Sequence, residues 1–315
     1  MSKLKKYIRN RLNAFVRNSY WFNNVYFQDC KKFWVKQDEK LDVVNLGSNS
    51  GKYGFDYNNT TNIKGENWAM GPQSLVEDFE ILKKYNVYLK DEAIVIIPLC
   101  PFSCLGGSSL YMPDKYYSIL DDSSIPQFNI KKKQEVEMIL ENPIHYYPLL
   151  ELVRDIKIKS KQILGIKKRI FKSNDITLKY NATSFINGWK SEFGIKNFYD
   201  ELSEINKKSY ADSVDILSEM ISFCLERGFK PILTIPPVSR HLLSYFTPEM
   251  KKLFIYDFIK KANSQNVPFI DFFDHPDFKD KNEYFLNSLF LNQKGAKAYT
   301  SALLKQLKKV EVTGS

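Results

Sequence analysis

The sequence predicts an α/β fold in which helices cover both faces of a parallel sheet. Short apolar segments bounded by turn residues alternate along the chain with segments whose apolar residues recur at helical spacing. Hydrophobic residues make up 43% and charged residues 26% of the 315 residues, which excludes disordered, collagen-like and coiled-coil classes. A chain of this length is sufficient for one large domain with an insertion.

The first half of the alternation begins with a short apolar strand at residues 41–46. A turn rich in glycine and serine follows at 47–51, and residues 72–89 have the apolar spacing of a helix. Residues 93–99 are continuously apolar, which is typical of a parallel strand buried on both faces. The predicted order is therefore strand, loop, helix and strand.

The second half repeats this alternation. We expect helices at 211–227 and 248–263, strands at 231–236 and 268–272, and a last helix that runs from Asn292 to about residue 308. Parallel sheets of this kind bind their ligands outside the carboxyl ends of the strands. We therefore expect the functional site at that edge.

The segments outside the alternation suggest an arm, an insertion and a tail. Residues 37–309 form the predicted α/β domain, residues 110–205 are a helical insertion in it, and residues 310–315 are a tail. Residues 1–36 are strongly basic and predict an amphipathic helix. Its apolar positions are Leu4, Ile8, Leu12 and Phe15. This arm either attaches to an anionic membrane surface or docks its apolar stripe on the domain.

The composition also limits partners and compartment. The formal net charge of +10 favours acidic partners such as phosphates, anionic lipids or acidic glycans, and no nucleic-acid-binding module is recognised. Only three histidines are present, the four cysteines lack metal-ligand or disulfide spacing, and glycine-rich phosphate motifs are missing. We expect no metal and no cofactor. With neither a signal peptide nor a membrane span in the pattern, we expect a cytoplasmic protein, which is peripheral at the inner face of the membrane if the arm attaches there.

Two segments resemble the SGNH or GDSL family of serine esterases and acyltransferases. They are Asn-Leu-Gly-Ser-Asn-Ser-Gly at 45–51 and Phe-Leu-Asn-Ser-Leu-Phe-Leu-Asn-Gln-Lys-Gly-Ala at 285–296. In the family the first block carries the nucleophilic serine, and the last carries Asp-x-x-His before a Leu-Asn pair. The resemblance covers roughly residues 40–110 and 205–309 and implies a three-layer, flavodoxin-like sheet.

The residues at the triad positions lack the usual chemistry. Asn49 occupies the position of the nucleophile, Asn287 that of the aspartate and Phe290 that of the histidine. Phenylalanine accepts no proton, and asparagine supplies no carboxylate to orient an imidazole. The ordinary mechanism of the family is therefore excluded at these positions.

A relocated triad is one remaining hypothesis for catalysis. Ser48 and Ser50 flank Asn49, and His275 follows Asp271 and Asp274 at the end of the last predicted strand. A triad is defined by geometry, so a serine, His275 and one aspartate would supply nucleophile, base and orienting group. The alternative is that these residues only stabilise their own turns.

A further group of residues follows the strands and predicts substrate binding. Arg240 and His241 directly follow the third predicted strand, where they would hold an anionic group. For two of these residues another role is open. Trp68 is then a core residue, and Lys52 is a solvated surface residue. The predicted substrate-binding residues are Lys52, Tyr53, Asn67, Trp68, Arg240, His241 and Asn292.

Two functions remain open. Proteins resembling this family commonly add acyl groups to surface carbohydrates or remove them, which implies O-acyl (acetyl) transfer or ester hydrolysis on a capsular or lipid-linked bacterial polysaccharide. The alternative is a catalytically degenerate protein that binds a glycan or a membrane-bound assembly partner in the former cleft. Asn49, Asn287 and Phe290 would then be binding groups.

Overall fold

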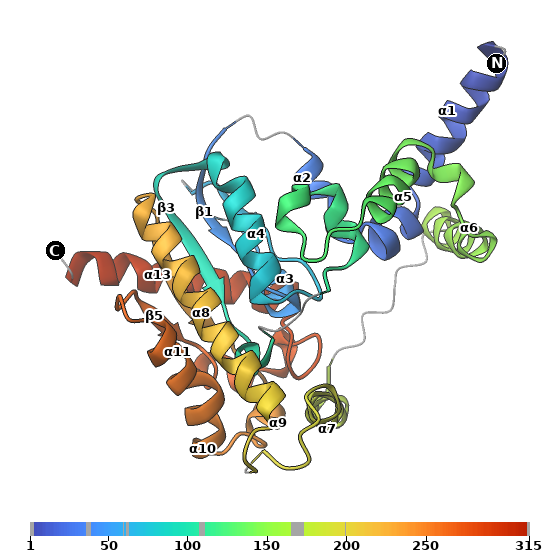
Figure 1. The fold of residues 1–315 in the computed structure, drawn as a ribbon. Helices are drawn as coiled ribbons and strands as arrows, with labels where there is room; N and C mark the ends of the chain where they lie inside the picture. Colours follow the sequence, from blue (N-terminus) through green and yellow to red (C-terminus); the bar gives the residue numbers. More distant parts are fainter. Residues whose placement is uncertain are drawn as a thin grey trace. The chain divides into compact units, whose positions relative to one another are not determined.

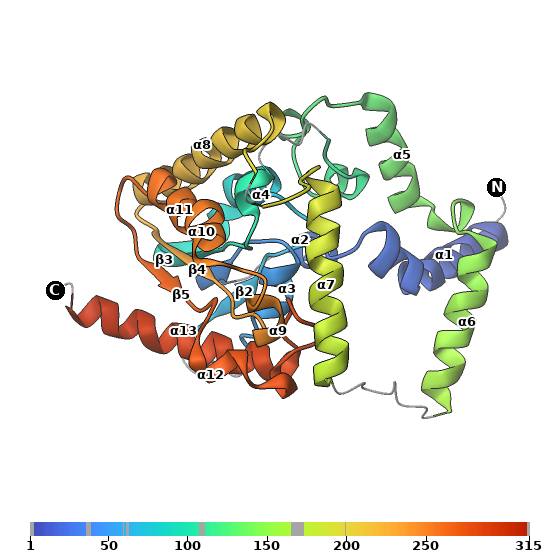
Figure 2. The same cartoon turned by 90° about the horizontal axis from the view of Figure 1, so that it is seen from below.

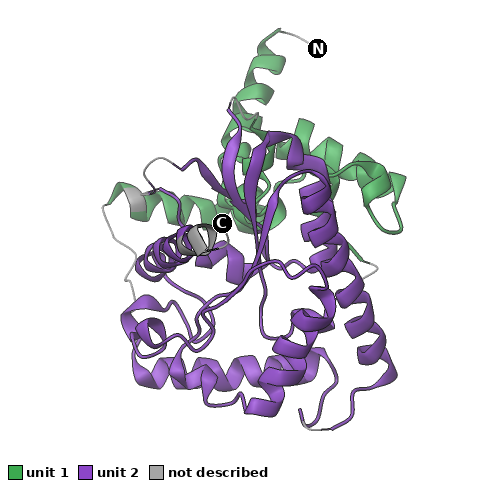
Figure 3. Cartoon of the chain, turned by 90° about the vertical axis from the view of Figure 1, so that its left-hand side faces the viewer, with its two compact units in different colours: residues 1–36, 110–171 green, residues 37–109, 172–315 purple. Residues whose placement is uncertain are grey.

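The computed structural model describes residues 3–35, 39–58, 60, 63–106, 111–164, 173–198 and 200–313. The chain divides into two compact units (Figure 3). Residues 1–36 and 110–171 form the first, which we call the helical unit, and residues 37–109 and 172–315 form the second, which we call the sheet unit.

The sheet unit is an α/β structure with five parallel strands, as the sequence predicts (Figure 1). The strand order is β2-β1-β3-β4-β5. The strands are β1 (Leu41–Asn45), β2 (Gly65–Asn67), β3 (Leu89–Pro98), β4 (Lys230–Ile235) and β5 (Phe269–Asp271). The sequence pattern gives four of these strands but not β2, whose three residues are too few to show a period.

Helices cover both faces of this sheet (Figure 2). One face carries α4 (Leu75–Tyr85), α8 (Glu204–Glu226) and α11 (Asp257–Ala262). The opposite face carries α13 (Gln293–Thr313), which packs on strand residues such as Val43 and Ile96. Burial of these apolar side chains is the main stabilising contribution to the sheet unit.

The remaining helical elements of the sheet unit are short, apart from α7 (Asp175–Glu192). The helix expected at 248–263 is divided into α10, a π-helical segment and α11. The α-helices of the sheet unit not yet given are α3 (Asn49–Gly54), α7 (Asp175–Glu192), α9 (Arg240–Leu243), α10 (Pro248–Lys251) and α12 (Pro276–Lys279). Its other turns are η2 (Asn86–Tyr88), η3 (Ser103–Leu105), η7 (Lys252–Tyr256) and η8 (Asn282–Tyr284).

The helical unit joins the N-terminal arm to much of the expected insertion. The predicted insertion at 110–205 is therefore divided, because α7 and residues 193–205 belong to the sheet unit. The α-helices of the helical unit are α1 (Lys3–Arg17), α2 (Lys31–Trp34), α5 (Ile130–Glu141) and α6 (Leu149–Ile163). Its other turns are η1 (Trp21–Tyr26), η4 (Asp114–Ser118), η5 (Asp122–Ser124) and η6 (Pro143–His145).

The end of α1 is fixed to the end of α5 by hydrogen bonds. The Arg17 guanidinium donates to the carbonyls of Leu140 and Glu141, each at 2.8 Å, and the buried Asn13 side chain accepts from the backbone N–H of Ile144 at 3.2 Å. Carbonyls at the end of a helix have no partner within it, and a cation there is favourable. The C-terminal end of α1 thus packs within the helical unit. Among the described residues, no helix combines the length and the apolar character of a membrane span.

The edge strand β2 requires a residue without a side chain at position 65. A Cβ atom at Gly65 would lie 2.5 Å from the Tyr57 ring and 2.8 Å from a methyl group of Val43. We predict that Gly65→Ala lowers the free energy of unfolding by about 1–3 kcal/mol through this overlap. The matched control is Gly188→Ala in α7, where no atom lies within 4 Å. It should stabilise by about 0.5–1 kcal/mol through helix propensity. Urea denaturation of both variants measures the difference, and equal stability would contradict the packing described.

A candidate ligand site at the carboxyl ends of β1 and β2

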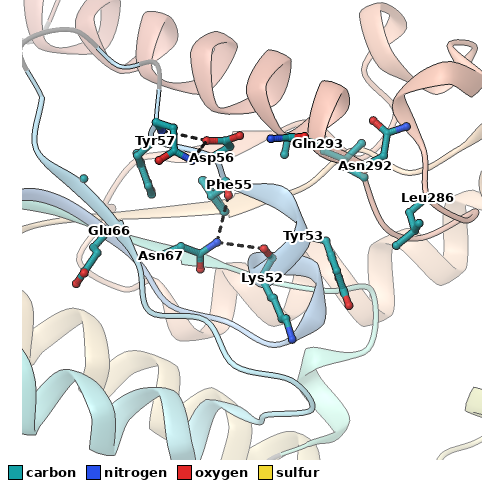
Figure 4. Close-up of a pocket in the computed structure, with 14 residues that line it drawn as sticks. Lys52, Tyr53, Phe55, Asp56, Tyr57, Glu66, Asn67, Leu286, Asn292 and Gln293 are labelled. Carbon is teal, nitrogen blue, oxygen red and sulfur yellow. Dashed lines mark hydrogen bonds between the residues drawn. The ribbon is translucent and has the colours of Figure 1, made fainter. Parts of the chain in front are cut away.

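A pocket of about 540 Å³ opens beside the ends of β1 and β2 (Figure 4). Its walls come from α3 and the segment after it, from β2, and from the loop that leads into α13. The lining residues are Lys52, Tyr53, Phe55, Asp56, Tyr57, Asn58, Gly65, Glu66, Asn67, Leu286, Leu291, Asn292, Gln293 and Ala296. Four of the seven predicted substrate-binding residues are therefore together here, namely Lys52, Tyr53, Asn67 and Asn292.

Asn67 forms the floor of this pocket and holds α3 in place. Its amide donates to the carbonyls of Gly51, Lys52 and Phe55 at 3.1, 3.2 and 3.3 Å, and Figure 4 shows the last two of these bonds. Its oxygen accepts from the buried Asn45 amide at 2.9 Å. The carbonyls at the end of a helix need partners from outside it. Asn67 thus has a structural role, which differs from the substrate-binding role predicted.

Asn292 also has a structural role at the rim. Its amide donates to the carbonyls of Glu283 and Phe285, and its oxygen accepts from the Gly295 N–H at 3.1 Å. This is the usual arrangement of an N-cap residue, which satisfies a free N–H in the first turn of a helix. Asn292 thereby fixes the start of α13, as its position in the sequence predicts.

Tyrosines provide the apolar surfaces and an unpaired hydroxyl. Tyr57 stacks on Phe55 with ring centroids 6.1 Å apart, and its hydroxyl is buried with no hydrogen-bond partner among the described residues. Burial raises the pKa of Tyr57 well above its usual value, so the hydroxyl stays protonated. An unpaired buried hydroxyl costs free energy unless a ligand or water bonds to it. Tyr57 is a candidate binding residue that the sequence analysis did not identify.

Asn287 and Phe290, which the family resemblance compares with the triad, contact their own turn and nearby aromatic rings. The Phe290 ring lies 5.4 Å from the Tyr53 ring and 5.7 Å from that of Phe185. The Asn287 side chain accepts from the N–H groups of Leu289 and Phe290. The contact with Tyr53 brings the loop before α13 to helix α3, which carries Asn49. The loop before α13 therefore contacts the helix in which the first of the two resembling segments ends.

The relocated triad is not formed. His275 accepts at Nδ1 from the Asp277 N–H at 3.2 Å and stacks on Phe272, whereas Ser48 accepts from the Gln73 N–H. Within the part of the chain that the structure describes, no hydrogen bond joins His275 to Ser48 or Ser50. The reason is topological, because β3 and β4 separate β1 from β5. Three strand spacings correspond to about 14 Å.

The two candidate aspartates have other partners. Asp271 accepts from the Tyr256 hydroxyl at 2.9 Å, and Asp274 forms ion pairs with Lys251 and Lys279. The pKa of Asp274 is lowered: burial opposes the change, but hydrogen bonds from both lysines outweigh it. Neither carboxylate contacts His275 through a hydrogen bond or ion pair, so neither orients the imidazole.

Arg240 and His241 do not line the pocket, and both bind a carboxylate of the protein itself. Both donate to one oxygen of Asp175 at 2.8 Å, and Asn282 donates to the same oxygen at 2.9 Å. These three hydrogen bonds, of which that from Asn282 has the largest effect, hold the pKa of Asp175 well below its usual value. The cluster ties α7 to α9, and it leaves Arg240 with a carboxylate in place of the predicted anionic substrate group.

Trp68 is a core residue, which is the alternative to the substrate-binding role. It is almost wholly buried, and its indole N–H donates to Glu66 at 2.8 Å. The described residues contain no group of three or more His, Cys, Asp or Glu side chains that could hold a metal ion.

A buried carboxyl lies under the turn that follows β1. Asp78 accepts from the Gly47 N–H at 2.6 Å and from the Gln73 amide. Burial raises the pKa of Asp78 to about 7, and the nearby Glu77 adds to the effect. The sequence contains a signal for this residue, because Asp78 falls on the apolar face of α4 between Leu75 and Leu82.

Comparison with protein-family models and with curated proteins gives no match for the sequence.

The raised pKa of Asp78 predicts a pH dependence of stability. The folded state binds this proton more tightly than the unfolded state, so the contribution to stability is complete below about pH 4 and is lost as the pH rises through 7. Asp78→Asn keeps a neutral acceptor for Gly47. We predict that it removes this dependence and raises the free energy of unfolding at pH 8 by up to a few kcal/mol relative to the unmodified protein.

Urea denaturation at pH 5 and pH 8 measures the effect, with the exposed Asp91→Asn as the control. A difference between Asp78→Asn and the unmodified protein that is the same at both pH values would contradict a buried, neutral carboxyl.

Proposed function

We propose that the pocket beside β1 and β2 binds a carbohydrate, and that the chain acts by binding in surface-polysaccharide assembly without serine chemistry. The observation that carries the proposal is the composition of the pocket. Two tyrosines, one with an unpaired buried hydroxyl, line it together with amide, carboxylate and ammonium groups.

These groups match the chemistry of a sugar. A sugar ring has apolar C–H faces, which pack on aromatic rings such as Tyr53, and hydroxyls that both donate and accept hydrogen bonds. Asp56 supplies acceptors, and Gln293 supplies a donor and an acceptor. The volume of about 540 Å³ lies within the range of small-molecule sites.

The charge of the site favours an acidic sugar. Lys52 lines the pocket, with its ammonium 5.5 Å from the Tyr53 ring, and the whole chain has a formal net charge of +10. A uronate carboxylate beside this ammonium would gain a charge-assisted hydrogen bond. We therefore place acidic oligosaccharides first among the candidate ligands.

Acyl transfer has less support from the geometry. Serine nucleophiles need a base within hydrogen-bond reach. The base expected for Ser48 or Ser50, His275, accepts a hydrogen bond from the Asp277 N–H. In the sequence resemblance, Phe290 stands at the position of the family's histidine and supplies no base.

The experiment is isothermal titration of the full chain with three oligosaccharide probes, made of neutral hexose, N-acetylhexosamine and uronate. We predict binding that is strongest for the uronate probe, a loss of about tenfold or more in Tyr53→Ala, and a smaller loss in Tyr57→Phe. Lys52→Gln should weaken the uronate probe more than the neutral one, because it removes only the charge-assisted bond.

The control is Tyr180→Ala, which removes an exposed tyrosine on α7 of the same unit. It should bind as the unmodified protein does. Absence of binding for all three probes, or equal affinity in the pocket variants and the control, would contradict the proposal.

A further inference from the structure

The helical unit exposes an apolar helix face. On α6, Leu149, Leu150, Val153, Ile156 and Ile163 are each more than half exposed to solvent. At 100° per residue these positions fall within one arc of about 140°. A surface helix of a globular protein usually turns such a face toward its own core. The apolar stripe of α6 instead faces solvent.

A buried carboxylate fixes this orientation of α6. Asp155, on the opposite side of the helix, is buried and accepts from the Tyr20 N–H and from the Tyr147 hydroxyl, both at 2.5 Å. The ammonium of Lys159 lies over the Phe15 ring at 4.2 Å. Rotation of α6 to bury the leucines would break both bonds to Asp155, which is costly for a buried polar group. The apolar face is therefore held outward.

Helix α1 of the same unit has a similar exposed stripe. Leu4, Ile8 and Leu12 are each more than two-fifths exposed. The helix contains six basic residues and no acidic residue. These are Lys3, Lys5, Lys6, Arg9, Arg11 and Arg17.

Basic residues also lie beside the stripe of α6. Lys157, within the arc, and Lys161, at its edge, are both exposed. The two acidic residues of α6 are occupied, since Asp155 is buried and Glu151 pairs with Arg154 at 3.3 Å. Both helices thus combine exposed apolar side chains with a surplus of positive charge.

We propose that the helical unit binds the surface of an anionic lipid bilayer through the exposed faces of α6 and the N-terminal half of α1. The apolar side chains enter the boundary between headgroups and acyl chains, and the lysines and arginines contact the lipid phosphates. The positive charge favours a lipid surface over a second copy of the chain as the partner. Pairing of α6 with α6 in a second copy would bring Lys157 and Lys161 of both copies together, whereas anionic headgroups neutralise them.

The test is co-flotation of the full chain with vesicles of phosphatidylcholine alone and with vesicles in which about a third of the lipid is phosphatidylglycerol. We expect binding to the anionic vesicles that is at least tenfold tighter and that weakens as salt is raised. The double variant Leu150→Glu with Val153→Glu, and the double variant Lys157→Glu with Lys161→Glu, should each lose at least tenfold in affinity.

The control is Val87→Glu, an exposed apolar residue of the sheet unit, which should bind as the unmodified protein does. All substituted side chains are exposed, and circular dichroism verifies folding. Equal binding to both vesicle types, or no effect of the α6 variants, would overturn the proposal. So would a concentration-dependent dimer in sedimentation equilibrium that the Leu150→Glu, Val153→Glu variant abolishes in a chain that binds no vesicles.

Discussion

The side chain of Asn67 is the constraint on which the candidate site depends. It joins the end of α3, the end of β2 and, through the Asn45 amide, the end of β1. The end of a six-residue helix has too few internal hydrogen bonds to be stable by itself. Because Asn67 supplies a partner for two carbonyls of α3 and for that of Phe55, which follows it, α3 keeps one orientation. Lys52 and Tyr53 are thereby held at the pocket.

The turn after β1 is held by hydrogen bonds to Asp78 and Ser48. Asp78, whose pKa burial raises to about 7, accepts from the Gly47 N–H, and the Ser48 hydroxyl accepts from the Gln73 N–H. A catalytic serine instead needs a base that takes its proton and an oriented charge that stabilises the resulting imidazolium. Phe290 packs its ring against Tyr53 and supplies no base. The ring of Tyr53, which lines the pocket, suits binding of a ligand whose ring packs on an aromatic surface.

The sequence predicts the sheet well and the site only in part, for physical reasons. Buried parallel strands are continuously apolar, so β1, β3, β4 and β5 are visible in the sequence, whereas β2 has only three residues and shows no period. The apolar pattern does not predict the order of the strands in the sheet. That order separates His275, after β5, from Ser48 and Ser50, after β1. Arg240 illustrates a second limit, because its partner Asp175 lies 65 residues away in the chain. An apolar stripe on α6 can be read from its spacing, but only the bonds to Asp155 show that it faces outward.

Labelling with a fluorophosphonate probe tests most directly whether the turn after β1 carries an activated serine; the structure described here has none, because His275 is hydrogen-bonded elsewhere. Trypsin releases residues 41–52 as one peptide that contains both Ser48 and Ser50, and mass spectrometry detects the added phosphonyl group. The account predicts no labelling of this peptide in the folded protein, at any pH at which the fold is intact by circular dichroism. Labelling of either serine that disappears in His275→Ala would contradict it and would establish a nucleophile activated by that histidine.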